Sequence, residues 1–423
     1  MNIKKNIIQN YRALRKIVKK TPLEYNERLS KIYNANIYLK REDLQFTRSF
    51  KIRGAYNKIL NSNIDSNKII VCSSAGNHAQ SIAYLSNILN IKCNIFLPNT
   101  TPQQKINRIK YFSNPELCNL TFAGNIFDEC LQESKIFARN NNSIYIHPFD
   151  DLDVITGQGT IGLEIDEQQK MDYVIASVGG GGLLSGLSAY YNNKCTIYGV
   201  ESEYNDSMKQ SIKQKKIITL NNNDFFVDGS AVKTPGQKTF DICKNYVHGF
   251  YKVSNNRVCY DLIDLYQNDG IVCELAGVMS ISCLHLIKEQ IKNKNVCCVI
   301  SGGNNDVLRL REIYDKKLIY ENKLHYFIFD FYQKPGELRK FINNVLDKND
   351  DIVRFEYLKK NADDFVEVSD LEAHKAVEHL EAEGISTTTS GGAGVAAIIQ
   401  RERLRLNIAE GAVCLAFVTE AAI

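Results

Sequence analysis

The chain has 423 residues, and its 52 Lys and Arg residues exceed its 48 Asp and Glu residues by only four. This length predicts two domains, and the near balance of charge leaves no broad basic surface that could hold a nucleic acid. No run of about 18 uncharged apolar residues occurs, and residues 1–20 lack the apolar centre of a signal peptide. We therefore expect a cytoplasmic protein that binds a small molecule and neither nucleic acid nor membrane.

Short apolar runs rich in β-branched residues alternate with helical patterns along the chain. The predicted strands are 68–72, 93–97, 143–147, 173–178, 196–200 and 296–301. Such alternation predicts an α/β fold with parallel sheets covered by helices on both faces. Because ligands of such sheets bind at the carboxyl ends of the strands, the residues that follow each strand are the candidates for a site.

The twelve cysteines include no C-x-x-C pair, so neither a zinc site nor a disulfide framework is indicated, and we expect no metal. Cys72, Cys273, Cys297 and Cys298 lie in apolar β-like runs. A reduced, buried thiol acts there as a small hydrophobic side chain.

The first candidate for chemistry is Lys51, in the segment Ser49-Phe50-Lys51-Ile52-Arg53. A lysine between Phe and Ile at the start of an apolar helix can be partly desolvated. Desolvation lowers its pKa and favours the free amine that imine formation needs. Taken alone, however, one lysine among many basic residues is far more often a solvated surface charge.

The second candidate is the loop 73–80, Ser-Ser-Ala-Gly-Asn-His-Ala-Gln, which follows the predicted strand 68–72. Its small residues let backbone N–H groups at the next helix N-terminus point at an anion such as a substrate carboxylate. Asn77 can hydrogen-bond a phenolic oxygen, but a simple helix cap is an equally good interpretation. His78 is either a base or a histidine that supports the loop.

The third candidate is a run of four glycines, Gly179, Gly180, Gly181 and Gly182, between the predicted strand 173–178 and a helix. The run exposes successive backbone amides, which suits a phosphate at a helix N-terminus. It lacks the lysine and Ser/Thr of a P-loop and the G-x-G-x-x-G spacing of a dinucleotide fold, which disfavours ATP and NAD. A flexible turn is the alternative.

The fourth candidate is Ser301-Gly302-Gly303-Asn304, after the predicted strand 296–301. A serine hydroxyl beside a pyridine nitrogen can only share a hydrogen bond, whereas a carboxylate would keep that nitrogen protonated. The ring is then a weaker electron sink, which suits elimination better than transamination. A turn or a helix cap is again the alternative.

The pattern changes after a charged stretch at 316–323. Residues 325–331 predict a strand, 335–346 a helix that starts at Pro335, and 352–358 a returning strand, as in a small ferredoxin-like unit. After about residue 361, alanine and glutamate replace the earlier Asn, Lys and Ile. We interpret this tail as a diverged second copy of the helix–loop–helix–strand unit that ends the α/β region.

Taken in order, these segments resemble the fold-type II pyridoxal-phosphate (PLP) enzymes, and among them the biosynthetic threonine dehydratases. The resemblance covers about residues 15–318. It rests on the segments 21–23, 40–45, 49–57, 74–80, 147–151, 155–160, 179–182, 199–201, 228–232 and 301–304.

The resemblance implies a two-subdomain catalytic domain of the tryptophan synthase β-like type over residues 1–318, with a smaller subdomain at roughly 50–150. It implies PLP as the cofactor and conversion of L-threonine to 2-oxobutanoate and ammonia, a step of isoleucine biosynthesis. We also expect a homo-oligomer.

The resemblance also implies roles for single residues. Lys51 is implied as the Schiff-base lysine and general acid/base, with Phe50 near the ring, Asn77 at the phenolic oxygen and Ser301 at the pyridine nitrogen. The glycines Gly179, Gly180, Gly181 and Gly182 are implied as the phosphate cup, and Ser74, Ala75, Gly76, Asn77 and His78 as the loop that receives the substrate carboxylate.

Two further positions carry information on the reaction. Related racemases have a serine at the position of Ala75 that serves as a base on the opposite face, so alanine there favours elimination. Glu274 resembles the active-site glutamate of the family and is implied in substrate binding, although a glutamate at a helix start is a fair alternative.

Residues 324–361 look like part of an ACT-like regulatory domain, an allosteric unit with isoleucine as a possible effector. The tail, 362–423, looks like the end of another fold-type II lyase, and Ser390 there duplicates Ser301. A PLP-dependent lyase acting on serine or a diamino acid is therefore the alternative enzyme. A non-catalytic amino-acid-binding regulator is the alternative from another class.

Overall fold

The computed structural model describes residues 2–62, 64, 68–125, 127–222 and 224–324, and in the C-terminal part residues 340, 370–383, 385, 395–396 and 399. The chain divides into two compact units, Met1–Phe327 and Ile328–Ile423. The residues that carry the predicted chemistry all belong to the first unit.

The larger sheet of the first unit has six strands in the order β1-β2-β10-β7-β8-β9. These are β1 (Leu23–Tyr25), β2 (Asn36–Arg41), β7 (Tyr173–Ser177), β8 (Thr196–Ser202), β9 (Gly249–Val253) and β10 (Asn295–Ile300). All neighbours are parallel except β1, which pairs with β2 in antiparallel fashion. The predicted parallel sheet is therefore confirmed, and the antiparallel edge strand is an addition to it.

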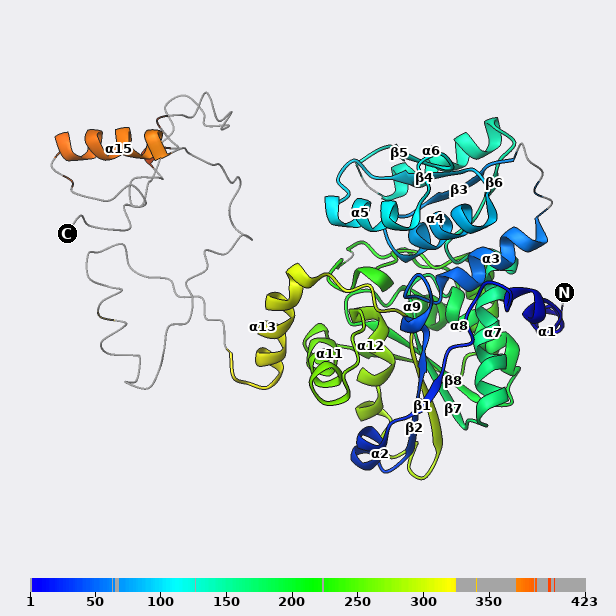
Figure 1. The fold of residues 1–423 in the computed structure, drawn as a ribbon. Helices are drawn as coiled ribbons and strands as arrows, with labels where there is room; N and C mark the ends of the chain where they lie inside the picture. Colours follow the sequence, from blue (N-terminus) through cyan, green and yellow to red (C-terminus); the bar gives the residue numbers. More distant parts are fainter. Residues whose placement is uncertain are drawn as a thin grey trace. The chain divides into compact units, whose positions relative to one another are not determined.

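The smaller sheet has four parallel strands in the order β5-β4-β3-β6. These are β3 (Ile70–Ser73), β4 (Cys93–Leu97), β5 (Cys118–Phe122) and β6 (Ile144–Tyr145). Figure 1 shows this sheet with its helices as one layer and the larger sheet as another. The two-subdomain catalytic fold expected from the resemblance is therefore confirmed.

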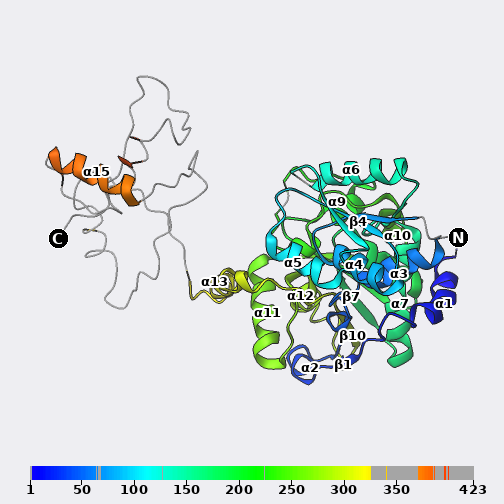
Figure 2. The same cartoon turned by 45° about the horizontal axis from the view of Figure 1, so that its top comes forward.

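Helices fill the connections between the strands. They are α1 (Ile3–Leu14), α2 (Glu27–Tyr33), α3 (Lys51–Asn61), α4 (Asn77–Leu89), α5 (Gln103–Phe112), α6 (Phe127–Asn140), α7 (Leu152–Gln168), α8 (Gly182–Tyr191), α9 (Ser207–Gln214), α10 (Gln237–Tyr246), α11 (Asn255–Asp269), α12 (Leu275–Ser282) and α13 (Leu310–Tyr320). In both views α3 lies beside α4 and α7, between the two sheets (Figures 1 and 2).

The central strand β10 shows why both faces of the larger sheet are covered. Cys297 and Val299 pack into a cluster with α8, whereas Cys298 and Ile300 pack into another with α11 and α12. Successive side chains of a strand point to opposite faces, so an uninterrupted apolar run can be buried on both. The cysteines expected in apolar runs are indeed free and buried.

In the second unit the structure describes α15 (Asp370–Ala382). The predicted strands 325–331 and 352–358 lie outside the described residues, as do Ser390 and most of the tail. Within the described part of the chain, none of the helices is long and apolar enough to cross a membrane.

Candidate active site

The segment that carries Lys51 is paired with the loop that carries Ser301. Phe50 N donates to Ser301 O (3.1 Å), and Ser49 forms an isolated antiparallel bridge with Gly302. Gly303 N completes the pairing by donating to Arg48 O (2.8 Å). Two candidates far apart in the sequence are thereby held side by side at the carboxyl end of β10.

Lys51 is the first residue of α3, and its amine lies in the protein interior. Its Nζ donates to Pro148 O (2.9 Å) and lies 5.2 Å from the centroid of the Phe50 ring. Burial lowers the pKa of Lys51 to about 8, although the carboxylate of Glu274 acts in the opposite direction. A larger fraction of the amine is therefore uncharged near neutral pH than in a solvated lysine, which favours imine formation.

Asn77 and Glu274 meet across the two subdomains. Asn77 Nδ2 donates to both carboxylate oxygens of Glu274 (2.9 and 3.0 Å). Burial raises the pKa of Glu274 to about 7, with the hydrogen bond from Asn77 acting against the rise. Asn304 Nδ2 donates to Asn77 Oδ1 (2.8 Å), so the fourth loop also fixes Asn77.

The four-glycine loop leads from β7 into the N-terminus of α8. Gly181 has φ +89°, a conformation that favours glycine, and a Cβ at Gly180 would collide with the ring of Phe149. Thr239 Oγ1 donates to Gly180 O (2.7 Å) and fixes the loop from α10. Backbone amides at the positive end of a helix dipole suit a phosphate group.

Ser301 is buried at the end of β10, and the hydrogen bonds of its hydroxyl are long. Its Oγ accepts from Ser177 Oγ at 3.3 Å and donates to Ala276 O at 3.4 Å. The nearby Ser49 Oγ and Asn304 Oδ1 are buried without a hydrogen-bond partner. Buried polar atoms are usually satisfied, so this set fits a polar group that the protein itself does not supply.

The loop Ser74–Asn77 is half-buried, and the space beside the Cα of Gly76 is open, since a Cβ there would meet nothing within 4 Å. His78 is buried, and its Nε2 lies 2.9 Å from Ile146 O. Because a carbonyl oxygen only accepts, Nε2 carries the proton. Burial lowers the pKa of His78 to about 3, so it remains neutral and supports the loop.

Together these groups fit PLP. The glycine loop suits its phosphate, Ser301 its pyridine nitrogen, Asn77 its phenolic oxygen, and Lys51 its aldehyde. Sequence reasoning assigned no role to Pro148 or Asn304. Pro148 acts through its backbone carbonyl, which no side-chain motif reveals. Asn304 could have been found, because it ends the same Ser-Gly-Gly-Asn loop.

Comparisons with known proteins agree with this arrangement. The family model of pyridoxal-phosphate dependent enzymes matches residues 14–302, and the model of the C-terminal regulatory domain of threonine dehydratase matches residues 315–378. The second match begins within α13 and continues past residue 361, where we expected the resemblance to end. The predicted domain boundaries, 1–318, 324–361 and 362–423, remain predictions.

Individual relatives support the same assignment. The biosynthetic L-threonine dehydratase IlvA of Staphylococcus epidermidis is 46% identical over 368 residues, which is 85% of this chain and 87% of the relative. The processed form of threonine deaminase isoform 2 from Solanum lycopersicum matches with a TM-score of 0.71 and 34% identity, over 75% of this chain and 88% of that one. Serine racemase from Dictyostelium discoideum matches with a TM-score of 0.66 and 30% identity, over 72% of this chain and 98% of that one. The chain therefore belongs to the pyridoxal-phosphate-dependent enzyme family and, within it, to the biosynthetic L-threonine dehydratases.

Proposed function

We propose that the chain converts L-threonine into 2-oxobutanoate and ammonia and so serves isoleucine biosynthesis. The observation that carries this proposal is the Lys51 amine, with a pKa of about 8, in a site built from the four-glycine loop, the Ser74–His78 loop and Ser301. The threonine dehydratase relatives supply the substrate.

The cofactor, when bound, supplies an aldehyde that condenses with amines and a ring that withdraws electrons from the substrate. The amides of Gly179–Gly182 would hold its phosphate, Asn77 would bind its phenolic oxygen, and Ser301 would bind its pyridine nitrogen. Ser301 offers a shared hydrogen bond and no charge, which supports loss of a β-hydroxyl over transamination.

Lys51 moves the proton in this proposal. When its amine is uncharged it accepts the proton from the substrate Cα, and Pro148 O keeps the amine oriented. Ala75 has no group that could act as a base from the opposite face, which favours elimination over racemisation. Glu274 belongs to the substrate-binding part of the site, where a carboxyl group with a pKa of about 7 can donate or accept a hydrogen bond.

The substrate carboxylate lies against the loop of Ser74, Ala75, Gly76, Asn77 and His78 in this proposal. The open space beside Gly76 supports it, and so do the amides at the N-terminus of α4. His78 is neutral and adds no charge to this anion site.

Turnover of three substrates tests the proposal. The holoenzyme should form keto acid fastest from threonine, more slowly from serine, and slowest from 2,3-diaminopropionate. Faster turnover of serine or the diamino acid would favour the alternative lyase. Cofactor bound at Lys51 without any keto acid would favour the non-catalytic regulator.

The C-terminal regulatory domain is the place for an effector, and we propose isoleucine as that effector. Isothermal calorimetry with isoleucine should show heat, and threonine turnover should fall in its presence. Absence of both effects would refute this part of the proposal. We also propose a homo-oligomer, which sedimentation velocity of the full chain tests.

A further inference from the structure

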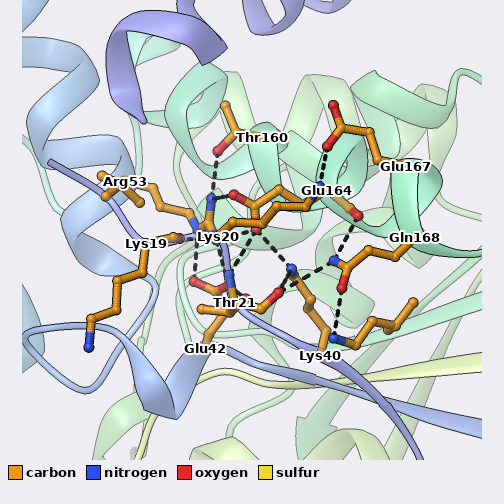
Figure 3. A network of polar contacts seen from close by, with 12 residues as sticks. Lys19, Lys20, Thr21, Lys40, Glu42, Arg53, Thr160, Glu164, Glu167 and Gln168 are labelled. Atoms are coloured by element: carbon orange, nitrogen blue, oxygen red, sulfur yellow. Dashed lines mark hydrogen bonds and ion pairs between the residues drawn. The ribbon is translucent and has the colours of Figure 1, made fainter. Parts of the chain in front are cut away.

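Four of the sequence segments that carry the family resemblance meet at one place outside the site. They contribute Thr21, Lys40, Glu42, Arg53 and Thr160, and Glu164 of α7 joins them. We call these six residues the ion network (Figure 3). None of these side chains is more than 1% exposed. The function proposed above uses none of them.

Arg53 lies at the centre of the ion network, two residues after Lys51 on α3. Its Nε and Nη2 donate to the two oxygens of Glu42 (2.8 and 2.7 Å). Its Nη1 and Nη2 donate to the two oxygens of Glu164 (2.9 and 2.8 Å). Nη1 also reaches Thr160 Oγ1 (3.2 Å). The guanidinium is thus hydrogen-bonded to two carboxylates, Glu42 after β2 and Glu164 on α7, as Figure 3 shows.

Lys40 and Thr21 complete the ion network: Lys40 balances the charge, and it connects the network to β2. Lys40 Nζ donates to Glu164 Oε2 (2.8 Å) and Thr21 O (2.7 Å), and Thr21 Oγ1 donates to Glu42 Oε1 (2.6 Å). Although burial alone would raise it, Arg53 and Lys40 hold the pKa of Glu164 below its usual range. Two cations therefore face two carboxylates, and the ion network is neutral.

The backbone of α3 is equally constrained at this place. A Cβ at Gly157 of α7 would collide with the carbonyl of Arg53, and a Cβ at Gly54 would collide with Gln158. Gly54 N donates to Gln158 Oε1 (3.2 Å). Because α3 and α7 touch through glycines, the backbone at the first turn of α3 has little room to shift against α7.

The energetics of buried charges suggest what the ion network is for. Replacing a buried ion cluster by apolar residues of similar size is often neutral or stabilising, so stability alone does not account for it. A helix turns by about 100° per residue, so residues two apart point to nearly opposite sides. Arg53 therefore anchors one side of the first turn of α3, which we call the rear side. Lys51 points from the opposite side, which we call the front side.

We propose that Arg53, held by Glu42 and Glu164, is a positioning residue that fixes the first turn of α3 and so keeps the amine of Lys51 against Pro148 O. This inference rests on the proposed function, in which Lys51 holds the cofactor and moves the proton. A displacement of about 1 Å at a reacting group can cost about 100-fold in rate.

The test removes one ion pair as a neutral unit. Glu42→Leu/Arg53→Met leaves Lys40 paired with Glu164 and introduces no unpaired charge. We expect it to fold, to lower kcat for threonine by about 10- to 100-fold, and to change KM less than about threefold. Borohydride reduction of the holoenzyme, followed by peptide mass spectrometry, should show a smaller fraction of Lys51 carrying the cofactor.

A second, partly buried ion pair provides the control. Arg257 and Asp261 of α11 form a bidentate pair whose side chains are 12% and 5% exposed. Arg257→Met/Asp261→Leu should keep kcat and the trapped fraction of Lys51 near wild-type values. Arg53→Lys retains the charge but not the fork, and should behave like the Glu42→Leu/Arg53→Met variant.

Three outcomes would overturn the positioning role: wild-type kcat and trapping in Glu42→Leu/Arg53→Met, equal losses in the two double variants, or wild-type behaviour of Arg53→Lys. If the Glu42→Leu/Arg53→Met variant fails to fold, Arg53→Lys alone decides. If the wild type traps cofactor at Lys51 but turns over no amino acid, the proposed function fails. The trapping comparison then still tests the positioning role.

Discussion

The two sides of the first turn of α3 use polar groups in opposite ways. On the rear side, all three nitrogens of the Arg53 guanidinium donate to carboxylates in a neutral, closed network. On the front side, the Lys51 amine donates to a single backbone carbonyl, and Ser49 Oγ nearby has no partner. Satisfied groups fix a structure, whereas unsatisfied groups are free to bind. The rear side, with Arg53, therefore fixes the turn, whereas the front side, with Lys51, is the side that we propose to react.

The strongest test of this comparison replaces one side chain on each side of the turn, Lys51 on the front side and Arg53 on the rear side. Lys51→Ala should lower threonine turnover by at least about 10⁴-fold and remove the absorption band of the Lys51-bound cofactor, while leaving the fold intact. Arg53→Met should instead destabilise the fold by about 3–5 kcal/mol, because it leaves a buried carboxylate without its partner. Absorption spectra, keto-acid assays and urea unfolding of both variants measure the contrast.

The contrast would be broken in either of two ways. A normal cofactor spectrum in Lys51→Ala would mean that another amine holds the cofactor. An Arg53→Met variant as stable as the wild type would mean that the ion network is not closed in solution.

The rear side includes the strand that the sequence did not predict, β2. The strand 93–97 was predicted with its exact bounds, because its apolar residues are buried on both faces. By contrast β2, Asn-Ile-Tyr-Leu-Lys-Arg, was missed, because Lys40 and Arg41 resemble a solvated segment. Lys40 is buried only because Glu164 pairs with it, and that partner lies 124 residues away in the sequence.

The front side was easier to predict, since each candidate follows its own strand. Parallel strands of one sheet bring their carboxyl ends to one edge, so the glycine loop after β7 and Ser301 after β10 could be expected near each other. The contact between Asn77 and Glu274 could not be expected, because it joins the two subdomains. The fold was thus predictable, whereas the contacts among the candidate residues were not, and the roles given to these residues remain predictions.

The next largest effect is expected for Ser301, which we propose as the partner of the pyridine nitrogen. Ser301→Ala removes a hydroxyl whose protein contacts are long, at 3.3 and 3.4 Å, so stability should change little. Threonine turnover should fall about 10- to 100-fold, because the hydroxyl acts on the cofactor. Steady-state kinetics and thermal unfolding measure the two quantities.

Two serines serve as controls for Ser301. Ser280 of α12 is buried and donates to Val299 O (3.0 Å), so Ser280→Ala should cost stability and leave turnover intact. Ser390 lies outside the described residues, and Ser390→Ala should leave turnover unchanged. The reverse result, with Ser390 essential and Ser301 dispensable, would mean that the tail supplies the pyridine partner.

A smaller effect, on cofactor binding, is expected for Thr239, which contacts the four-glycine loop from α10. Thr239→Val keeps the side-chain shape but removes the hydrogen bond to Gly180 O. One such bond contributes about 1 kcal/mol, so cofactor dissociation should become about fivefold to tenfold easier. Equilibrium dialysis of PLP measures this constant. Thr234, whose hydroxyl donates to Thr219 Oγ1 near the surface, is the control, and equal weakening by Thr234→Val would refute the assignment.

The smallest effect is expected for His147, next to Pro148, and concerns the loss of folding stability at acid pH. His147 Nδ1 accepts the backbone N–H groups of Phe149 (3.2 Å) and Asp150 (2.8 Å), and so must be unprotonated on that nitrogen. Burial lowers the pKa of His147 from 6.5 to about 4. The unfolded chain therefore takes up this proton first as the pH falls, so the stabilisation is complete above pH 6.5 and is lost between pH 6.5 and 4.

His147→Asn tests this directly, since an amide oxygen can accept the same N–H groups and does not titrate. Between pH 7 and pH 5.5 the wild type should lose about 1 kcal/mol more unfolding free energy than the variant, as measured by urea unfolding at both pH values. His78 is also buried and neutral, but it is present in both proteins and cancels in the difference. Equal losses would mean that folding does not lower the pKa of His147, and that the segment holding Pro148 O against Lys51 is kept in place without it.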